Sequence, residues 1–142
     1  MVKAVYEKRD RDAKGILLMD EILDILSKNH IAFEQCLTGI DTVTLVIRTD
    51  YLSDCKEDLI REIKNTLNPG HIGLTENLSM IAVVGERSTD TCDANVRVLQ
   101  ALADAGIEIS TINQGAGKLN LLIAVPEEKY EQAIRVIYST IE

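Results

Sequence analysis

The chain has no tryptophan and only one phenylalanine among its 142 residues. Proteins that hold single-stranded nucleic acid use aromatic rings on which bases stack, and this chain has few of them. Positive charge is also scarce, because 15 lysines and arginines are outnumbered by 23 aspartates and glutamates, for a net charge of −8. A surface of that sign repels the phosphates of a nucleic acid. We therefore expect no nucleic-acid partner.

Long hydrophobic runs are missing as well, although 46% of the residues are hydrophobic. None approaches the roughly 18 residues that a membrane-spanning helix needs, and residues 1–8 are too charged for a secretory signal. The three cysteines, Cys36, Cys55 and Cys92, are scattered and odd in number, which favours reduced thiols over a disulfide framework. We expect a cytoplasmic globular protein with no membrane contact.

Residues with catalytic or metal-binding spacing are equally scarce. There is no C-x-x-C pair, no Ser/His/Asp set and no paired-carboxylate set. The two histidines, His30 and His71, lie far apart in the sequence with no third partner. Cys36 takes an apolar position in the repeat described below, so we expect a buried thiol there. The chain by itself is expected to have no catalytic residue, no metal site and no cofactor.

One glycine-rich stretch, residues 113–118, invites comparison with the phosphate-binding loop G-x-x-x-x-G-K-[S/T]. With Gly117 and Lys118 as the G-K pair, the first glycine should stand at Ile112 and the serine or threonine at Leu119, so both anchors fail. A phosphate loop must also lead into a helix, whereas this stretch lies between two predicted strands. We interpret it as a hairpin turn.

The sequence contains an internal repeat. The segment that begins at Leu26 matches the one that begins at Leu102, an offset of 76 residues. At that offset, the positions that follow are matched as Gly39 with Gly115, Val43 with Leu119, Leu45 with Leu121, and Ile47 with Ile123. The offset then falls to 74 at Leu59 and Ala133, so the first copy is expected to hold two extra residues before its last helix.

Each copy shows the same succession of periodicities. Apolar residues at helical spacing are followed by two alternating segments joined by a glycine-containing turn, and then by a second helix. His30 and Gly106 end the first helix of each copy, and Gly106 suits the left-handed position there. With strands at residues 2–6 and 79–85 opening the copies, the unit is βαββαβ, an α+β ferredoxin-like fold. Its antiparallel sheet has helices on one face, and we expect a second unit to cover the other.

Three features of the second copy form a recognisable pattern. They are the strand end at residues 83–85, the helix-to-strand passage at residues 102–109, and Asn120 near the start of the next strand. Together they resemble the second ACT module of aspartate kinases, and the first copy, from Ile22 to Thr38, is similar to the first ACT module. Residues 122–126 resemble the lysine-sensitive, monofunctional branch of that family. The resemblance covers nearly the whole chain and implies ACT modules in tandem.

The resemblance implies an allosteric regulatory fragment with no enzyme activity of its own. Aspartate kinases phosphorylate aspartate with ATP, and ATP and Mg²⁺ belong to a kinase domain that precedes the ACT pair and that nothing here resembles. The implied partners are an amino-acid effector (lysine first, threonine next), a second copy of the chain in a homodimer, and the kinase domain of the parent chain. The alternative is a stand-alone ACT-pair sensor or dimerisation module with no kinase partner.

In that family the effector lies where the first ACT modules of two subunits meet. By resemblance, Glu34 takes the acidic place that holds the effector's ammonium group, a suitable partner for a cation. Gly15 takes a place near the effector's carboxylate, where the amides that begin a helix favour an anion. The remaining positions of the implied site are Ala32, Phe33, Thr38, Gly39 and Asp41.

The implied site departs from the family's pattern at two points. The lysine-sensitive pattern T-S-E is replaced by Thr38-Gly39-Ile40, so a hydroxyl and a carboxylate are missing, and Asp41 could replace the carboxylate only by turning inward. The helix start S-x-G-F is also looser here, where Gly15 is followed by an isoleucine. The plain alternative for Glu34 is a solvated acid at the end of a strand.

The resemblance also sets the expected domain boundaries, with residues 9–78 in the first ACT module and residues 79–142 in the second. In the family, the strand that matches residues 2–7 joins the sheet of the second module, and we predict that arrangement. The simple repeat would instead give this strand to the first module. On the predicted arrangement, either residues are missing between Lys8 and Ile16 or the first module lacks its opening strand.

Overall fold

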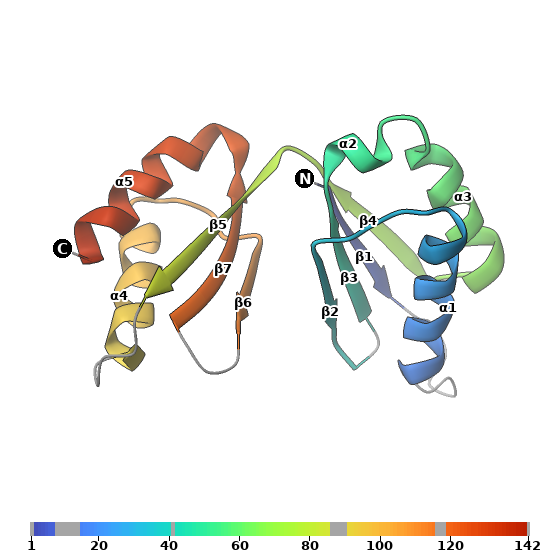
Figure 1. Cartoon of the computed structure of the whole chain (residues 1–142), viewed down its shortest axis with the longest axis horizontal. Coiled ribbons are helices and arrows are strands. Elements are labelled where there is room, and N and C mark those ends of the chain that lie inside the picture. The colour runs from blue at the N-terminus through green and yellow to red at the C-terminus, as the bar shows by residue number, and fades with distance from the viewer. Residues whose placement is uncertain (1, 8–14, 41, 86–90, 116–118, 142) are drawn as a thin grey trace. The chain divides into compact units, whose positions relative to one another are not determined.

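The computed structural model describes residues 2–7, 15–40, 42–85, 91–115 and 119–141. The chain divides into two compact units, Met1–Glu76 and Asn77–Glu142, so the boundary lies two residues before the predicted one. Both units are α+β with antiparallel sheets, as predicted. Figure 1 shows that each unit has its helices on one face of its own sheet.

The first unit has the complete βαββαβ order. Its strands are β1 (Val2–Glu7), β2 (Gln35–Thr38), β3 (Thr42–Ile47) and β4 (His71–Thr75), and its helices are α1 (Gly15–Lys28), the short α2 (Thr49–Leu52) and α3 (Lys56–Leu67). The strands form one antiparallel sheet in the order β2-β3-β1-β4, which leaves β2 and β4 at its two edges.

Strand β1 corrects the prediction that residues 2–7 join the sheet of the second module. Val5 lies opposite Thr44 of β3 on one side and opposite Gly73 of β4 on the other, so β1 is a central strand of the first unit. The physical reason is that β1, between β3 and β4, pairs its backbone groups with a strand on each side. The first unit therefore keeps its opening strand.

The second unit repeats this plan, with three strands among its described residues. Its elements are β5 (Leu78–Gly85), α4 (Thr91–Asp104), β6 (Thr111–Gln114), β7 (Leu119–Pro126), the 3₁₀ turn η1 (Glu127–Lys129) and α5 (Tyr130–Ile141). The sheet order is β5-β7-β6, which corresponds to β1-β3-β2 of the first unit. The glycine-rich stretch connects the antiparallel neighbours β6 and β7, which confirms that it does not lead into a helix; residues 116–118 lie outside the described residues.

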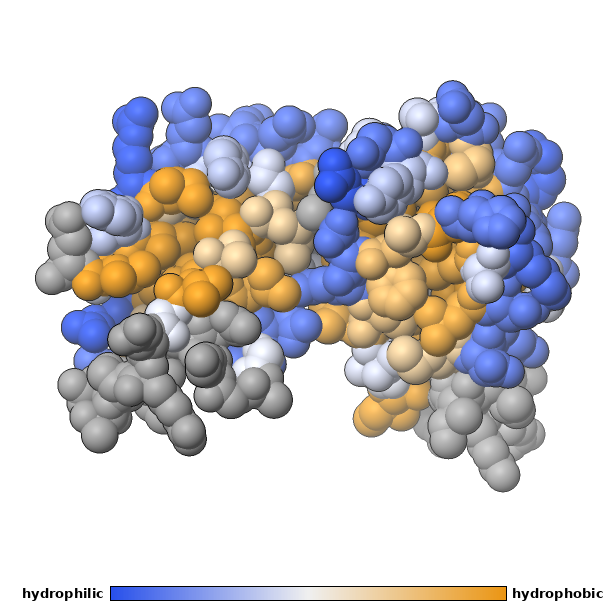
Figure 2. All heavy atoms as spheres, in the orientation of Figure 1, coloured by the Kyte–Doolittle hydropathy of each residue, from blue (hydrophilic) through white to orange (hydrophobic). Residues whose placement is uncertain are grey.

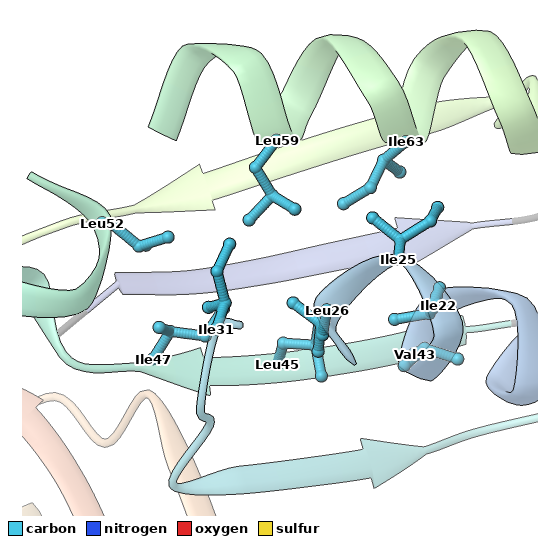
Figure 3. Close-up of a cluster of buried hydrophobic side chains, with 10 residues drawn as sticks. All are labelled: Ile22, Ile25, Leu26, Ile31, Val43, Leu45, Ile47, Leu52, Leu59 and Ile63. Carbon is cyan, nitrogen blue, oxygen red and sulfur yellow. The ribbon is translucent and has the colours of Figure 1, made fainter. Parts of the chain in front are cut away.

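Each unit has its own hydrophobic core between helices and sheet. In Figure 3, side chains of α1 and α3 point toward those of β3, and Ile31 and Leu52 complete the first cluster. The second cluster is built in the same way from β5, α4, β7 and α5, with Leu102 and Ile123 fully buried. Burying one such side chain contributes about 1.5–3 kcal/mol, so the two clusters stabilise the two units separately.

The strand register corrects the predicted repeat alignment. Thr38 lies opposite Val43, whereas Gln114, its counterpart, lies opposite Leu121, so the second hairpin is two residues longer. The core residues that correspond are therefore Val43 with Leu121, Leu45 with Ile123, and Ile47 with Val125. The offset between β3 and β7 is therefore 78 residues. It is 74 between α3 and α5, where Leu59 and Ala133 are both buried. The first copy accordingly has four extra residues before α3, in the segment that contains α2.

Apolar side chains also remain at the surface of each unit, as Figure 2 shows. On α5 they form a stripe at helical spacing, next to the buried Ala133 and Ile137. Its members are 39–64% exposed: Tyr130, Ile134, Tyr138 and Ile141. Helix α5 thus has a broader apolar face than its own core uses.

Candidate functional site

The predicted site residues lie at two opposite ends of the first unit. The chain runs along α1 from Gly15 to Lys28, turns, and runs back along β2, so residues 32–34 lie near one end and Gly15, Thr38 and Gly39 near the other. Figure 1 shows the start of α1 and the β2–β3 hairpin at the same end. Helix α1 has 14 residues, which corresponds to about 20 Å. A single unit therefore does not bring all of these residues to one small ligand.

The end that carries residues 32–34 is called the Glu34 end below. It begins where α1 stops: the backbone N–H of Ile31 donates to the carbonyl of Leu26 at 2.9 Å, and the buried Ile31 ties the chain to the core. The backbone N–H of Glu34 donates to the carbonyl of Val46 at 2.8 Å. Ala32, Phe33 and Glu34 are all exposed, so their side chains are available to a ligand.

The other end, with Gly15, Thr38 and Gly39, is called the hairpin end. The N–H of Gly39 donates to the carbonyl of Thr42 at 2.8 Å and closes the turn. A Cβ built at Gly39 would overlap the Thr42 Oγ1 atom, which explains a glycine at this position. Asp41 lies outside the described residues. Helix α1 begins at Gly15 with no acidic residue in its first turn, so the positive end of the helix is not neutralised from within.

A charged cluster at the Glu34 end was missed by the sequence reasoning. Arg48 directly follows β3, and its Nε and Nη2 atoms each donate to a carboxylate oxygen of Asp50 at 3.1 Å. The guanidinium also lies over the ring of Tyr51, with Cζ 5.4 Å from the ring centre. Glu34 is near enough to act electrostatically on Arg48. The only signal in the sequence was an arginine two residues before an aspartate at the end of a strand.

The pKa values of this cluster follow from its hydrogen bonds. The Arg48 hydrogen bonds hold the pKa of the Asp50 carboxyl below its usual value, and backbone N–H groups of Asp50 and Tyr51 act in the same direction. The Asp50 carboxylate in turn raises the pKa of the Arg48 guanidinium. Both groups are therefore charged at neutral pH, and the guanidinium is held in one orientation by two hydrogen bonds and a ring.

The cysteine prediction can also be compared with the structure. Cys36 is half-buried and packs against the first core, in agreement with its apolar place in the repeat. Desolvation raises the pKa of its thiol, which keeps it protonated at neutral pH and lowers its reactivity.

Among the described residues, no group of three His, Cys, Asp or Glu side chains is arranged to hold a metal ion. None of the described helices has the length and hydropathy to cross a membrane.

The sequence is similar to those of known proteins. Residues 81–141 match the ACT domain family. The chain is 27% identical to Aspartokinase 3 of Bacillus subtilis over 117 residues, which cover 82% of this chain and 26% of the relative. It is 24% identical to the aspartokinase of Saccharomyces cerevisiae over 153 residues, which cover 94% of this chain and 29% of that protein. The chain thus spans between a quarter and a third of the length of these relatives.

Solved structures show the same likeness. The aspartate kinase of Clostridium acetobutylicum superimposes with a TM-score of 0.88 and 26% identity, over 99% of this chain and 32% of that one. The regulatory subunit of aspartate kinase from Thermus flavus superimposes with a TM-score of 0.79 and 17% identity, over 99% of this chain and 92% of that one. The chain therefore shares its fold with that regulatory subunit over nearly the whole of both chains. These findings support an ACT regulatory region of the aspartate kinase type.

Proposed function

We propose that this chain is the allosteric, amino-acid-binding region of an aspartate kinase, in which an end-product amino acid inhibits the phosphorylation of aspartate. The observation that carries the proposal is the agreement of the whole chain, in fold and extent, with a regulatory subunit of aspartate kinase. Lysine is the favoured effector and threonine the next. A structure of Escherichia coli aspartokinase III, 23% identical to this chain, is a complex with lysine and aspartate.

The ligand site would be completed by a second copy of the chain. Strand β2 is an edge of the first sheet, so its outward backbone groups can pair with another strand. If two β2 strands meet antiparallel about a two-fold axis, the Glu34 end of one copy lies beside the hairpin end of the other. The arrangement unites the residues that one unit keeps apart, and it creates two equivalent sites per homodimer.

The chemistry of such a site suits a zwitterion. The exposed carboxylate of Glu34 would hold an ammonium group of the effector, because a carboxylate and an ammonium form a charge-assisted hydrogen bond. The amides at the start of α1 in the second copy, beginning at Gly15, would receive the effector's carboxylate. Ala32 and Phe33 would form one wall, and Thr38 and Gly39 the other.

Regulation would follow from differential binding. An effector that holds two first units together stabilises one arrangement of the dimer over others, and a kinase domain joined to the chain would sense that arrangement. The chain alone would bind the effector without catalysing phosphoryl transfer, since ATP and Mg²⁺ would be bound by the kinase domain of the parent protein. An assay of this chain with aspartate and ATP should accordingly yield no aspartyl phosphate.

A thermal-shift titration with lysine and threonine, run side by side, tests the proposal. A ligand that binds only the folded state raises the unfolding midpoint as its concentration rises above the dissociation constant. Glu34→Gln should abolish most of the shift. Asp54→Asn removes one exposed negative charge from the same unit and should leave the shift unchanged. Absence of a shift with every amino acid tried would refute effector binding.

Sedimentation and amide hydrogen exchange test the dimer. The outward amides of β2 have no strand beside them within the first unit, so they exchange fast in a monomer. In the proposed dimer they should be protected, and the protection should increase with protein and effector concentration. Fast exchange along β2 in a dimeric sample would show that the copies meet elsewhere.

A further inference from the structure

The Arg48 side chain makes more contacts than a simple surface ion pair. It follows β3 directly, beside the Glu34 end, and its side chain is half exposed at 50%. Asp50 accepts hydrogen bonds from Nε and Nη2, and the Tyr51 ring supports the guanidinium plane. A side chain held at one edge and one face has little conformational freedom left to lose when a ligand binds it.

The guanidinium keeps donors to spare. An arginine side chain has five N–H groups, of which Asp50 occupies one on Nε and one on Nη2. No other hydrogen-bond acceptor contacts this guanidinium among the described residues. The remaining N–H groups on Nη1 and Nη2 form an edge with the geometry that binds a carboxylate through two parallel hydrogen bonds. The edge is therefore an anion receptor already oriented by the fold.

The neighbouring group has the opposite sign. The Glu34 carboxylate is exposed, and the backbone N–H of Glu34 donates to the carbonyl of Val46, two residues before Arg48, yet no ion pair between Glu34 and Arg48 is formed in the described structure. An α-amino acid has an ammonium and a carboxylate on the same carbon. A free carboxylate next to a free guanidinium edge offers the complementary pair of charges.

We infer that Arg48 anchors the carboxylate of the amino-acid ligand while Glu34 holds its ammonium group; the inference rests on the proposed function. The anchor is compatible with helix amides from a second copy, because a carboxylate has about four acceptor positions and can be shared by two donors. It also assigns Asp50 and Tyr51 a role, which is to position Arg48. The ligand is therefore expected to be an amino acid with a free α-carboxylate, and an amino-acid amide should bind more weakly.

The test compares each amino acid with its amide. Lysine and lysinamide, and threonine and threoninamide, are titrated against the full chain by calorimetry. The amides keep the α-ammonium and the side chain but lack the carboxylate charge. Wild type should bind the acid about tenfold or more tightly than the amide, the ratio expected for losing one charged hydrogen-bonded contact. In Arg48→Gln that ratio should fall several-fold, and the preference that remains is the part contributed by the helix amides of the second copy.

Two further variants make the result specific. Arg48→Lys keeps the positive charge but loses the paired donors, so its ratio should be intermediate. Arg61→Gln removes another exposed arginine of the first unit, paired with Asp58 on α3, and should leave the ratio at its wild-type value. Circular dichroism and the unfolding midpoint confirm that each variant is folded.

The outcomes separate the two proposals. If wild type prefers the acid and Arg48→Gln keeps the same preference, the role of Arg48 is overturned while effector binding stands. If wild type binds acid and amide equally, no anchor for the carboxylate exists and the inference also falls. If no amino acid binds at all, the proposed function is overturned, and the role of Arg48 with it.

Discussion

His30 and Gly106 have the same left-handed backbone conformation at equivalent places in the two units. The φ angle is 54° at His30, after α1, and 67° at Gly106, after α4. Each helix ends in the same pair of hydrogen bonds, since the N–H of residue 30 or 106 donates three residues back and the next N–H donates five residues back. Glycine adopts this conformation freely, whereas a residue with a Cβ is strained in it.

The first prediction concerns single substitutions at these two positions. His30→Gly should raise the free energy of unfolding of the first unit by about 0.5–1 kcal/mol, because it removes left-handed strain. Gly106→Ala should lower that of the second unit by about 1 kcal/mol, although a Cβ there meets nothing within 4 Å. Urea unfolding of both variants measures the two changes. The two changes in the free energy of unfolding should have opposite signs, and a destabilised His30→Gly would contradict the strain at His30.

The second prediction concerns the independence of the two cores. Leu26 and Leu102 are both almost completely buried at matching positions of α1 and α4. Replacing either by alanine leaves a cavity and should cost about 2–5 kcal/mol. Hydrogen exchange should locate the loss in the first unit for Leu26→Ala and in the second for Leu102→Ala. A loss of protection spread evenly over both units in each variant would show that they unfold together.

The third prediction is the pH dependence of the Asp50 contacts. The pKa of Asp50 is lower in the folded chain than in the unfolded chain, so the contacts stabilise the fold at pH values above the unfolded pKa. That contribution is lost as the pH falls through the lower, folded pKa. NMR titration should show the Asp50 midpoint below 3.8, its ordinary value, and Arg48→Gln should move the midpoint upward. An unchanged midpoint would mean that the backbone amides alone lower it.

The fourth prediction tests the tight turn at Gly39. Gly39→Ala should destabilise the hairpin by about 1 kcal/mol, because the new methyl group overlaps Thr42 Oγ1 and forces it to move. Thr42→Ala removes the obstructing oxygen, so the same Gly39 substitution should cost less in that background. A double-mutant cycle measures the coupling between the two positions. Additive effects would place the cost in the backbone of the turn.

Much of this fold could be predicted from local patterns. The apolar positions of α1, α3, α4 and α5 were predicted from periodicity, and both helix ends at His30 and Gly106 were predicted as well. The register of β7 was predicted wrongly by two residues. A strand has a side-chain period of two, so a slip of two residues keeps every apolar side chain on the same face. Periodicity alone cannot detect such a slip in the long apolar run around Ile123.

The site shows a similar division. Ala32, Phe33 and Glu34 are exposed, but they lie just before β2 (Gln35–Thr38) and not at the end of a strand. Arg48 could not be predicted as their neighbour, because its nearness to Glu34 depends on the pairing of β2 with β3. The separation of Gly15 from Glu34 was also not evident, since it follows from the direction in which α1 lies on the sheet.

The sequence by itself determined that the chain is a duplicated βαβ-type unit, because helical and alternating periodicities are local properties of the chain. Only the tertiary structure decided that β1 pairs with β3 and β4, since strand pairing joins residues that are far apart in sequence. It also decided that the two halves of the candidate site lie at opposite ends of one unit. The reason is that α1 and β2 run in opposite directions over the same sheet, and no local pattern records that distance.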